Sequence, residues 1–148
     1  MTLPQTLDEF TQTSMSALLV DHLAGNRISS VNVEPHGSPG QVADVFTINV
    51  AYDKPSSLPR RFIAKVSASS QSARELGITF GLYERETQFY RRFLNPGIST
   101  PQCYFTSFDD ESQAHLILLE DLAPAESPSW GCSLGQVKNA IEAIATFH

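Results

Sequence analysis

Alternating apolar and polar positions along this chain predict a β-sheet. The strongest stretch is 43–52, whose apolar residues recur at every second position on one face: Phe46, Ile48, Val50 and Tyr52. Shorter stretches predict four more strands, at 29–34, 61–66, 102–108 and 115–120. Because the first three strands follow one another with only short polar loops between them, the sheet is expected to be antiparallel.

Capping signals and helical periodicity predict three helices. Thr6-Leu7-Asp8-Glu9 has the pattern of a capping box and predicts a helix that continues to Gly25. A second capping box at 133–136 predicts a helix that runs to His148. The third helix is expected at 82–94 and ends near an Asn-Pro-Gly sequence at 95–97. The serine-rich residues before it are interpreted as a connection.

The expected fold class is therefore α+β, with a five-stranded antiparallel sheet, one helix packed across it and a further helix at each end. Composition agrees with a globular domain, since 41% of the 148 residues are hydrophobic and 18% are charged. The net charge of -6 argues against a nucleic-acid partner, which normally meets a basic surface.

Cysteine usage and the amino terminus indicate a cytoplasmic protein. Cys103 and Cys132 show no metal-binding spacing, and two cysteines fit a reducing compartment. The four histidines lie far apart in the sequence and give no support for a metal site. No signal peptide or apolar run of membrane-spanning length is visible, so no membrane association is expected.

The most informative candidate residues are Lys65 and Glu86. The helix at 82–94 is expected to bury one face, and a glutamate falls among its apolar residues: Leu82, Glu86, Phe89 and Phe93. A carboxylate on a packing face is costly unless a cation meets it, and Lys65 in the preceding strand is the obvious partner. The alternative is that both are ordinary solvated charges, with Lys65 near a strand end and Glu86 at the edge of its face.

Two other segments contain candidate binding groups. The turn at 37–41 offers glycines, a hydroxyl and backbone N–H groups that could hold phosphate, although hairpin geometry alone also favours glycine. The strand at 115–120 breaks into Glu120-Asp121-Leu122, where free backbone groups could pair with an adenine edge. The alternative there is a strand that ends in solubilising charges. In the strand at 61–66, Ile63 shares a face with Lys65 and would lie over a base.

These segments together resemble the amino-terminal lobe of the aminoglycoside phosphotransferase and choline kinase-like superfamily, nearest its ecdysteroid-kinase-like branch, which has a protein-kinase-like fold. The resemblance covers nearly the whole chain. It is carried by five sequences: Phe62-Ile63-Ala64-Lys65-Val66, Arg85-Glu86-x-x-Phe89-Tyr90, Leu118-Leu119-Glu120-Asp121-Leu122, Gly131-Cys132-Ser133 and Ile144-Ala145-Thr146-Phe147-His148.

The resemblance implies an ATP site. Lys65 would bind the phosphates with Glu86 as its partner, as in protein kinases. Leu119 would be the gatekeeper, and the main chain of Glu120 and Leu122 would meet the adenine. The loop over the phosphates would consist of four residues: Gly37, Ser38, Gly40 and Gln41.

The resemblance also implies that residues 1–122 form the lobe, 123–133 a linker and 134–148 the first helix of a second lobe. Catalytic and Mg²⁺-binding residues belong to that second lobe, and no His-x-Asp sequence occurs in the chain.

Two functions stay open. One is the ATP-binding lobe of a kinase for a small-molecule alcohol, such as an aminoglycoside, choline or a sterol. The other is a non-catalytic interaction domain that self-associates through an exposed apolar surface.

Overall fold

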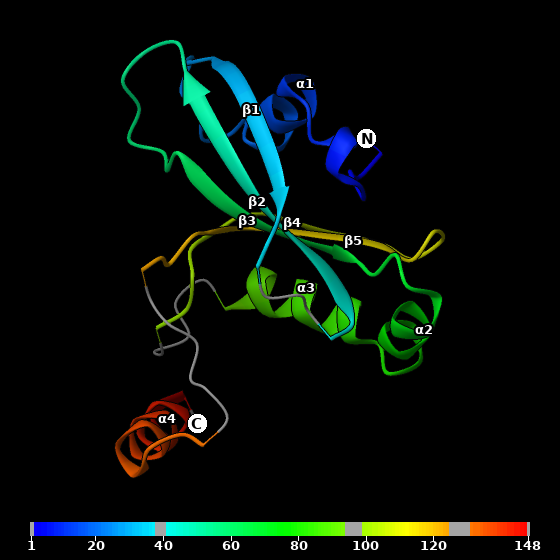
Figure 1. The fold of residues 1–148 in the computed structure, drawn as a ribbon, viewed down its shortest axis with the longest axis vertical. Coiled ribbons are helices and arrows are strands. Elements are labelled where there is room, and N and C mark those ends of the chain that lie inside the picture. Colours follow the sequence, from blue (N-terminus) through cyan, green and yellow to red (C-terminus); the bar gives the residue numbers. More distant parts are fainter. Residues whose placement is uncertain (1, 38–40, 94–98, 125–130, 148) are drawn as a thin grey trace.

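The computed structural model describes residues 2–37, 41–93, 99–124 and 131–147. Within these ranges the chain has an α+β fold with a five-stranded antiparallel sheet, as the sequence predicted, and four α-helices where three were expected. The sheet forms the middle layer in Figure 1, with α1 on one side of it and α3 on the other. The α+β class and the five-stranded antiparallel sheet are thereby confirmed, while the protein-kinase-like arrangement stays a prediction.

The sheet has the strand order β1-β2-β3-β5-β4, and every neighbouring pair is antiparallel. Its third strand in sequence, β3, therefore lies in the centre between β2 and β5. The bounds agree with the predicted strands to within one residue: β1 (Ile28–Pro35), β2 (Ala43–Tyr52), β3 (Arg61–Ser67), β4 (Cys103–Asp109) and β5 (Ala114–Glu120).

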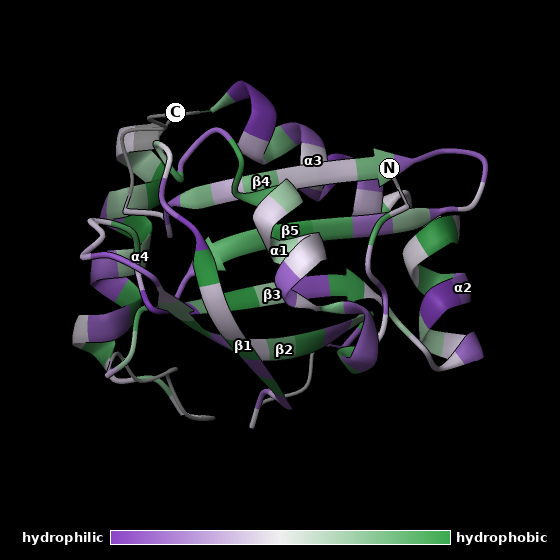
Figure 2. Ribbon diagram, turned by 90° about the horizontal axis from the view of Figure 1, so that it is seen from above, coloured by the Kyte–Doolittle hydropathy of each residue, from purple (hydrophilic) through white to green (hydrophobic). Residues whose placement is uncertain are grey.

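One face of the sheet carries the hydrophobic core. Successive side chains of β3 point to opposite faces, so Phe62, Ala64 and Val66 are buried while Ile63 and Lys65 are only partly buried. The N-terminal segment lies across the buried face, where Figure 2 shows α1 (Gln12–Leu18) in front of the strands. The residues of this core are Leu3, Phe10, Met15, Leu18, Leu19, Ile28, Phe46, Ile48, Val50, Phe62, Ala64, Val66, Leu116 and Leu118.

The prediction of one continuous N-terminal helix up to Gly25 was wrong. The capping box at Thr6 begins only a 3₁₀ helix, η1 (Leu7–Glu9), and α1 ends at Leu18. A new N-terminus forms at Thr11, whose side chain accepts a hydrogen bond from the backbone of Ser14. The break allows Phe10 to turn into the core against Phe46, with 5.9 Å between the ring centroids.

A helix was missed in the serine-rich segment after β3. Helix α2 (Gln71–Thr79) occupies it, and its Gly77 packs against α3 (Leu82–Arg92). A Cβ at Gly77 would lie 2.5 Å from Cζ of Tyr83, so only glycine permits this close approach. Gly81 lies in the left-handed region at φ 60° and reverses the chain between the two helices.

The face of α3 that packs on the sheet differs from the predicted one. Tyr83 and Thr87 are buried, whereas Phe93, expected on the packing face, is exposed. Glu86 lies at the edge of the true face, between the sheet and solvent. The buried face is thus displaced by about one residue, or roughly 100°, from the predicted one, and the Tyr83 ring on it stacks on His115 of β5. The residues predicted to end α3, at 95–97, lie outside the described ranges.

Helix α4 (Leu134–Phe147) begins at the predicted capping box, in which Ser133 and Gln136 bond to each other's backbone. It lies apart from the sheet in Figure 1, and all side chains at 134–146 are exposed. The domain division at 122 and 133 stays a prediction. Searching the described residues for a helix with the length and hydropathy needed to cross a membrane finds none.

Candidate functional site

Lys65 and Glu86 form an ion pair between the central strand and α3. Lys65 Nζ donates a hydrogen bond to Glu86 Oε1, as the sequence predicted. Both side chains are partly exposed, at 28% for Lys65 and 33% for Glu86, so solvent and solutes reach the pair. Glu86 therefore orients the Lys65 ammonium group, which stays accessible to solvent and is not a buried core contact.

The strand pairing explains where the lysine points. Lys65 lies opposite Val45 on β2 and Ile117 on β5, at the middle of the sheet. Ile63 lies opposite Leu119 and shares the face of Lys65, two residues along β3. The structure thus brings together four predicted site residues on the α3 side of the sheet: Lys65, Glu86, Ile63 and Leu119.

Tyr83 attaches α3 to the ends of two strands. Its hydroxyl donates to the Val42 carbonyl at 2.7 Å and accepts from the Ala68 N–H at 3.2 Å. Val42 precedes β2 and follows the turn predicted to hold phosphate, and Ala68 follows β3. One side chain therefore links the base of that turn to the helix that carries Glu86.

A buried histidine completes the site. His115 at the start of β5 has no exposed surface, and its ring stacks on Tyr83 with 5.0 Å between centroids. Its Nε2 lies 3.9 Å from Glu86 Oε2. Burial, together with the smaller effect of the positive charge of Lys65, lowers the pKa of His115 to about 4. The imidazole is consequently neutral at pH 7.

The predicted loop residues are only partly visible. Ser38 and Gly40 lie outside the described residues, while Gly37 and Gln41 flank them at the tip between β1 and β2. The base of the hairpin is fixed by His36, whose N–H donates to Val45 O at 2.9 Å and whose Nδ1 lies 3.0 Å from Thr47 Oγ1. The proximity of the predicted loop residues at 37–41 to Lys65 stays a prediction.

The end of β5 is tied into the sheet on both sides. The Glu120 N–H donates to Gln102 O, and Glu120 Oε1 accepts from Gln102 N, both at 2.9 Å. Arg61 Nε lies 2.7 Å from Asp121 Oδ2, which attaches the residues after β5 to the start of β3. The N–H of Glu120 is therefore already used, whereas Leu122 lies beyond the strand with its side chain 50% exposed.

The roles of His115 and Tyr83 were missed from the sequence. The signal for His115 was present, because at the two-residue period it shares a face with Ile117 and Leu119. A polar residue in register with an apolar face predicts either a solvent-exposed strand end or a buried polar contact. Only the position of α3 decides between these, and its packing face had been assigned to other residues.

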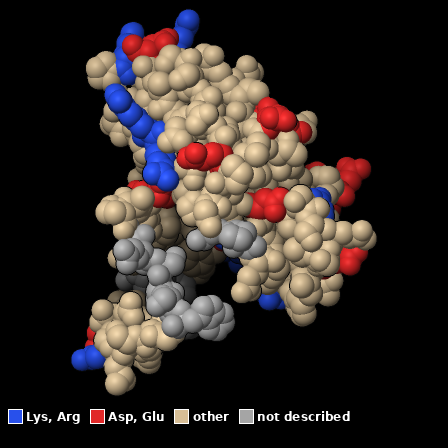
Figure 3. All heavy atoms as spheres, viewed as in Figure 1, with Lys and Arg blue, Asp and Glu red and all other residues tan. Residues whose placement is uncertain are grey.

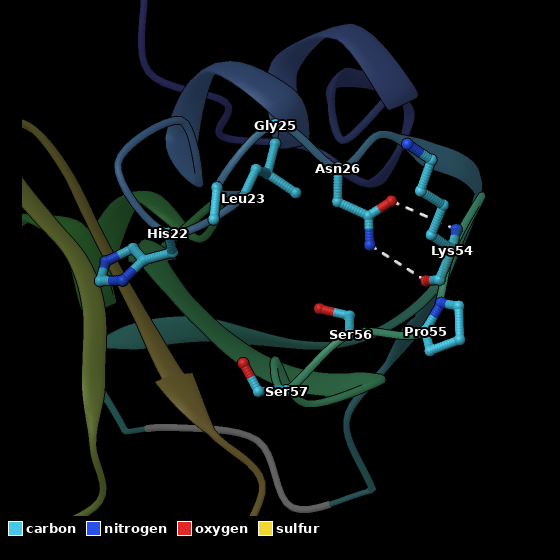
Figure 4. Close-up of a pocket in the computed structure, with 9 residues that line it drawn as sticks. His22, Leu23, Gly25, Asn26, Lys54, Pro55, Ser56 and Ser57 are labelled. Atoms are coloured by element: carbon cyan, nitrogen blue, oxygen red, sulfur yellow. Dashed lines mark hydrogen bonds between the residues drawn. The ribbon is translucent and has the colours of Figure 1, made fainter.

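Two pockets formed by the described residues lie away from the ion pair of Lys65 and Glu86. One of about 230 Å³ lies between the loop at 22–26 and the loop at 54–57, where the Asn26 side chain bonds both backbone groups of Lys54 (Figure 4). The other, of about 740 Å³, is lined by the N-terminal residues, Arg74 and the β4–β5 hairpin. Neither is lined by Lys65 or Glu86.

Other reactive groups contribute little to this site. Burial raises the pKa of the Cys103 thiol to about 11, so it is protonated and a poor nucleophile. Among the described residues, no three histidine, cysteine, aspartate or glutamate side chains gather as a metal site. On the face shown in Figure 3, basic and acidic side chains lie in small groups, some of them next to one another, among other residues.

Comparison with known proteins finds no family model that matches the chain and no curated protein with a significantly similar sequence.

Proposed function

We propose that this chain is the ATP-binding lobe of a phosphotransferase that acts on a small-molecule alcohol, with a protein-kinase-like arrangement of sheet and helix. The observation that carries the proposal is the ion pair between Lys65 on β3 and Glu86 on α3. Protein kinases hold the α- and β-phosphates of ATP with a lysine on the third strand that pairs with a glutamate on the following helix.

The geometry of the pair suits a phosphate ligand. An ammonium group has three donors, and Glu86 Oε1 takes one of those of Lys65. The remaining donors can bond phosphate oxygens, and charge-assisted bonds of this kind are the stronger ones. Ile63 and Leu119 would supply apolar surface for the base on the same face. Because the Glu120 N–H is bonded to Gln102 O, the Glu120 carbonyl and the main chain of Leu122 would meet the polar edge of the base.

The rest of the reaction is assigned to a second lobe. Residues at 37–41 would cover the phosphates, while Mg²⁺, the catalytic aspartate and the alcohol would bind outside the residues described here. In phosphoryl transfer the metal neutralises the charge that develops on the phosphates. The chain by itself is therefore proposed to bind the nucleotide and to orient its phosphates, without turning it over.

Calorimetric titration of the full chain with ATP tests the proposal, using Lys65→Met and the control Lys54→Met. Lys54 is an exposed lysine in the β2–β3 loop, so both changes remove one positive charge. We expect Lys65→Met to weaken ATP binding at least about tenfold, since a hydrogen bond to a charged group contributes about 1.5–3 kcal/mol. Lys54→Met should bind like the unchanged chain. Equal affinities for the two variants, or no ATP binding by the unchanged chain, would overturn the proposal.

A second candidate function is a non-catalytic interaction domain, which the exposed surface of α4 favours. Its apolar residues recur at spacings of three and four: Leu134, Val137, Ile141 and Ile144. This spacing is typical of a helix that packs against a second helix. Sedimentation over a range of concentrations should then show dimers, and Ile141→Asp should restore the monomer. A chain that stays monomeric at every concentration would contradict this function.

A further inference from the structure

We propose that His115 is a positioning residue for Glu86: its neutral imidazole donates from Nε2 to Glu86 Oε2 when nucleotide phosphates compete for Lys65. The inference rests on the proposed function and adds a residue to that site. It assigns a role to the one fully buried histidine in the described residues, for which packing alone gives no reason.

The cost of burying this ring is the first observation. His115 has no exposed surface, and neither ring nitrogen has a hydrogen-bond partner among the described residues. A buried polar group without a partner is destabilising, and an apolar ring of similar shape would pack there at lower cost. The presence of an imidazole at this position is thus better explained by a hydrogen bond of the ring that is not formed in this structure.

The second observation is that a carboxylate oxygen of Glu86 lies near the imidazole of His115. Glu86 Oε1 holds Lys65, and the other carboxylate oxygen, Oε2, lies 3.9 Å from His115 Nε2. A hydrogen bond needs about 2.7–3.2 Å, so the carboxylate has to move by roughly 1 Å. A phosphate that takes up the remaining donors of Lys65 would weaken the bond of Lys65 to Oε1, so the carboxylate can make that movement without leaving Lys65.

The ring itself is held in place, so Glu86 is the partner that moves. The backbone N–H of His115 donates to Ser67 Oγ at 3.0 Å, and the imidazole ring stacks on Tyr83. Tyr83 in turn is hydrogen-bonded to Val42 and Ala68. A glutamate on an 11-residue helix with 33% of its side chain exposed has more freedom than this clamped ring.

The charge state of the ring fits a donor that does not displace Lys65. The titratable groups that face it are Lys65 from β3 and Glu86 and Tyr83 from α3, and its cross-strand neighbour on β4 is the uncharged Phe108. Since burial and Lys65 keep the ring neutral, it supplies one N–H without adding a second cation. Lys65 therefore stays the only positive charge of this group.

The first test compares His115→Phe with the conservative variant His115→Gln, measuring ATP affinity and urea stability of the full chain at pH 7. Phenylalanine fills the space without a donor, so stability should be retained or raised while ATP binding weakens about tenfold. Glutamine supplies an amide N–H at a similar reach and should restore binding to within about threefold of the unchanged chain. If His115→Phe binds ATP normally, or if both variants lose affinity and stability in parallel, His115 is only a packing residue.

The second test needs no nucleotide. Imidazole ¹⁵N spectra give the pKa of His115, with the other three histidines as internal references. Glu86→Gln removes the neighbouring anion and should lower that pKa further, whereas Glu84→Gln, on the exposed side of the same helix, should leave it unchanged. An unchanged pKa in Glu86→Gln would overturn the coupling. If the coupling is found but the unchanged chain binds no ATP, the proposed function fails and the role of His115 in nucleotide binding fails with it, while the contact itself stands.

Discussion

The two faces of this sheet are covered in different ways. On the face under the N-terminal segment, β3 contributes Phe62, Ala64 and Val66 to a core without charged residues. On the face under α3, the same strand contributes Lys65, which meets Glu86 beside the buried His115. Alternation along one strand thus separates a region that stabilises the fold from a region that contains reactive and chargeable groups.

The difference shows how a polar site can be built at the centre of a small domain. The apolar face supplies most of the burial, so the opposite face can hold a partly exposed ion pair and an imidazole without hydrogen bonds. An ion pair of this exposure contributes little to stability, commonly about 0–1 kcal/mol. Substitutions on the two faces are therefore expected to separate stability from binding.

The largest expected effect is on the apolar face. Phe62→Ala should lower the free energy of unfolding by about 3–5 kcal/mol, because a fully buried aromatic ring leaves a cavity. Ile63→Ala, one residue along the strand on the other face, should cost less than half as much. Urea denaturation of both variants measures this contrast. Similar losses for the two positions would show that the faces are equally packed.

Gly77→Ala tests how closely α2 and α3 approach. Its new Cβ would lie 2.5 Å from the Tyr83 ring, so the helices must separate, at a cost of about 1–3 kcal/mol. Gly135→Ala in exposed α4 is the matched control, since its Cβ meets no atom closer than 3.8 Å. That control should be neutral or slightly stabilising. A Gly77→Ala protein as stable as the unchanged chain would mean that Tyr83 is not fixed as described.

The buried histidine predicts a pH dependence of the polar face. The pKa of His115 is about 4 in the folded chain and about 6.5 when unfolded, so between these values the unfolded state binds more protons. The free energy of unfolding should fall as pH decreases from about 6.5 toward 4, at up to about 1.4 kcal/mol per pH unit. His115→Phe should reduce this slope in urea titrations between pH 7 and 5. An identical slope in both proteins would contradict a buried, neutral imidazole.

The parts of the fold that were predicted correctly are those fixed by local periodicity. Five strands and the partnership of Lys65 with Glu86 follow from alternation and from the order of strand and helix. The missed α2 contains Ser72 and Gly77, which lower helix propensity, and it packs against Tyr83 of α3. Local preference gave no indication of that contact.

The packing face of α3 was predicted wrongly for a similar reason. Counting apolar residues favours Phe89 and Phe93, but the helix buries Tyr83 and Thr87 against the sheet. Tyr83 has partners at Val42 and Ala68 for its hydroxyl and at His115 for its ring. A side chain that satisfies three contacts at once outweighs a count of apolar positions, and those contacts come from residues far apart in the sequence.

The role of Lys65 as a phosphate ligand is tested most directly by comparing the affinities of ATP and adenosine for the unchanged chain and for Lys65→Met. The account predicts that Lys65→Met reduces the preference for ATP over adenosine at least about tenfold, since one charge-assisted contact to phosphate is lost. Adenosine affinity should not change, and the free energy of unfolding should change by less than about 1 kcal/mol. An unchanged preference for ATP in a folded Lys65→Met chain would contradict the claim that Lys65 holds the phosphates.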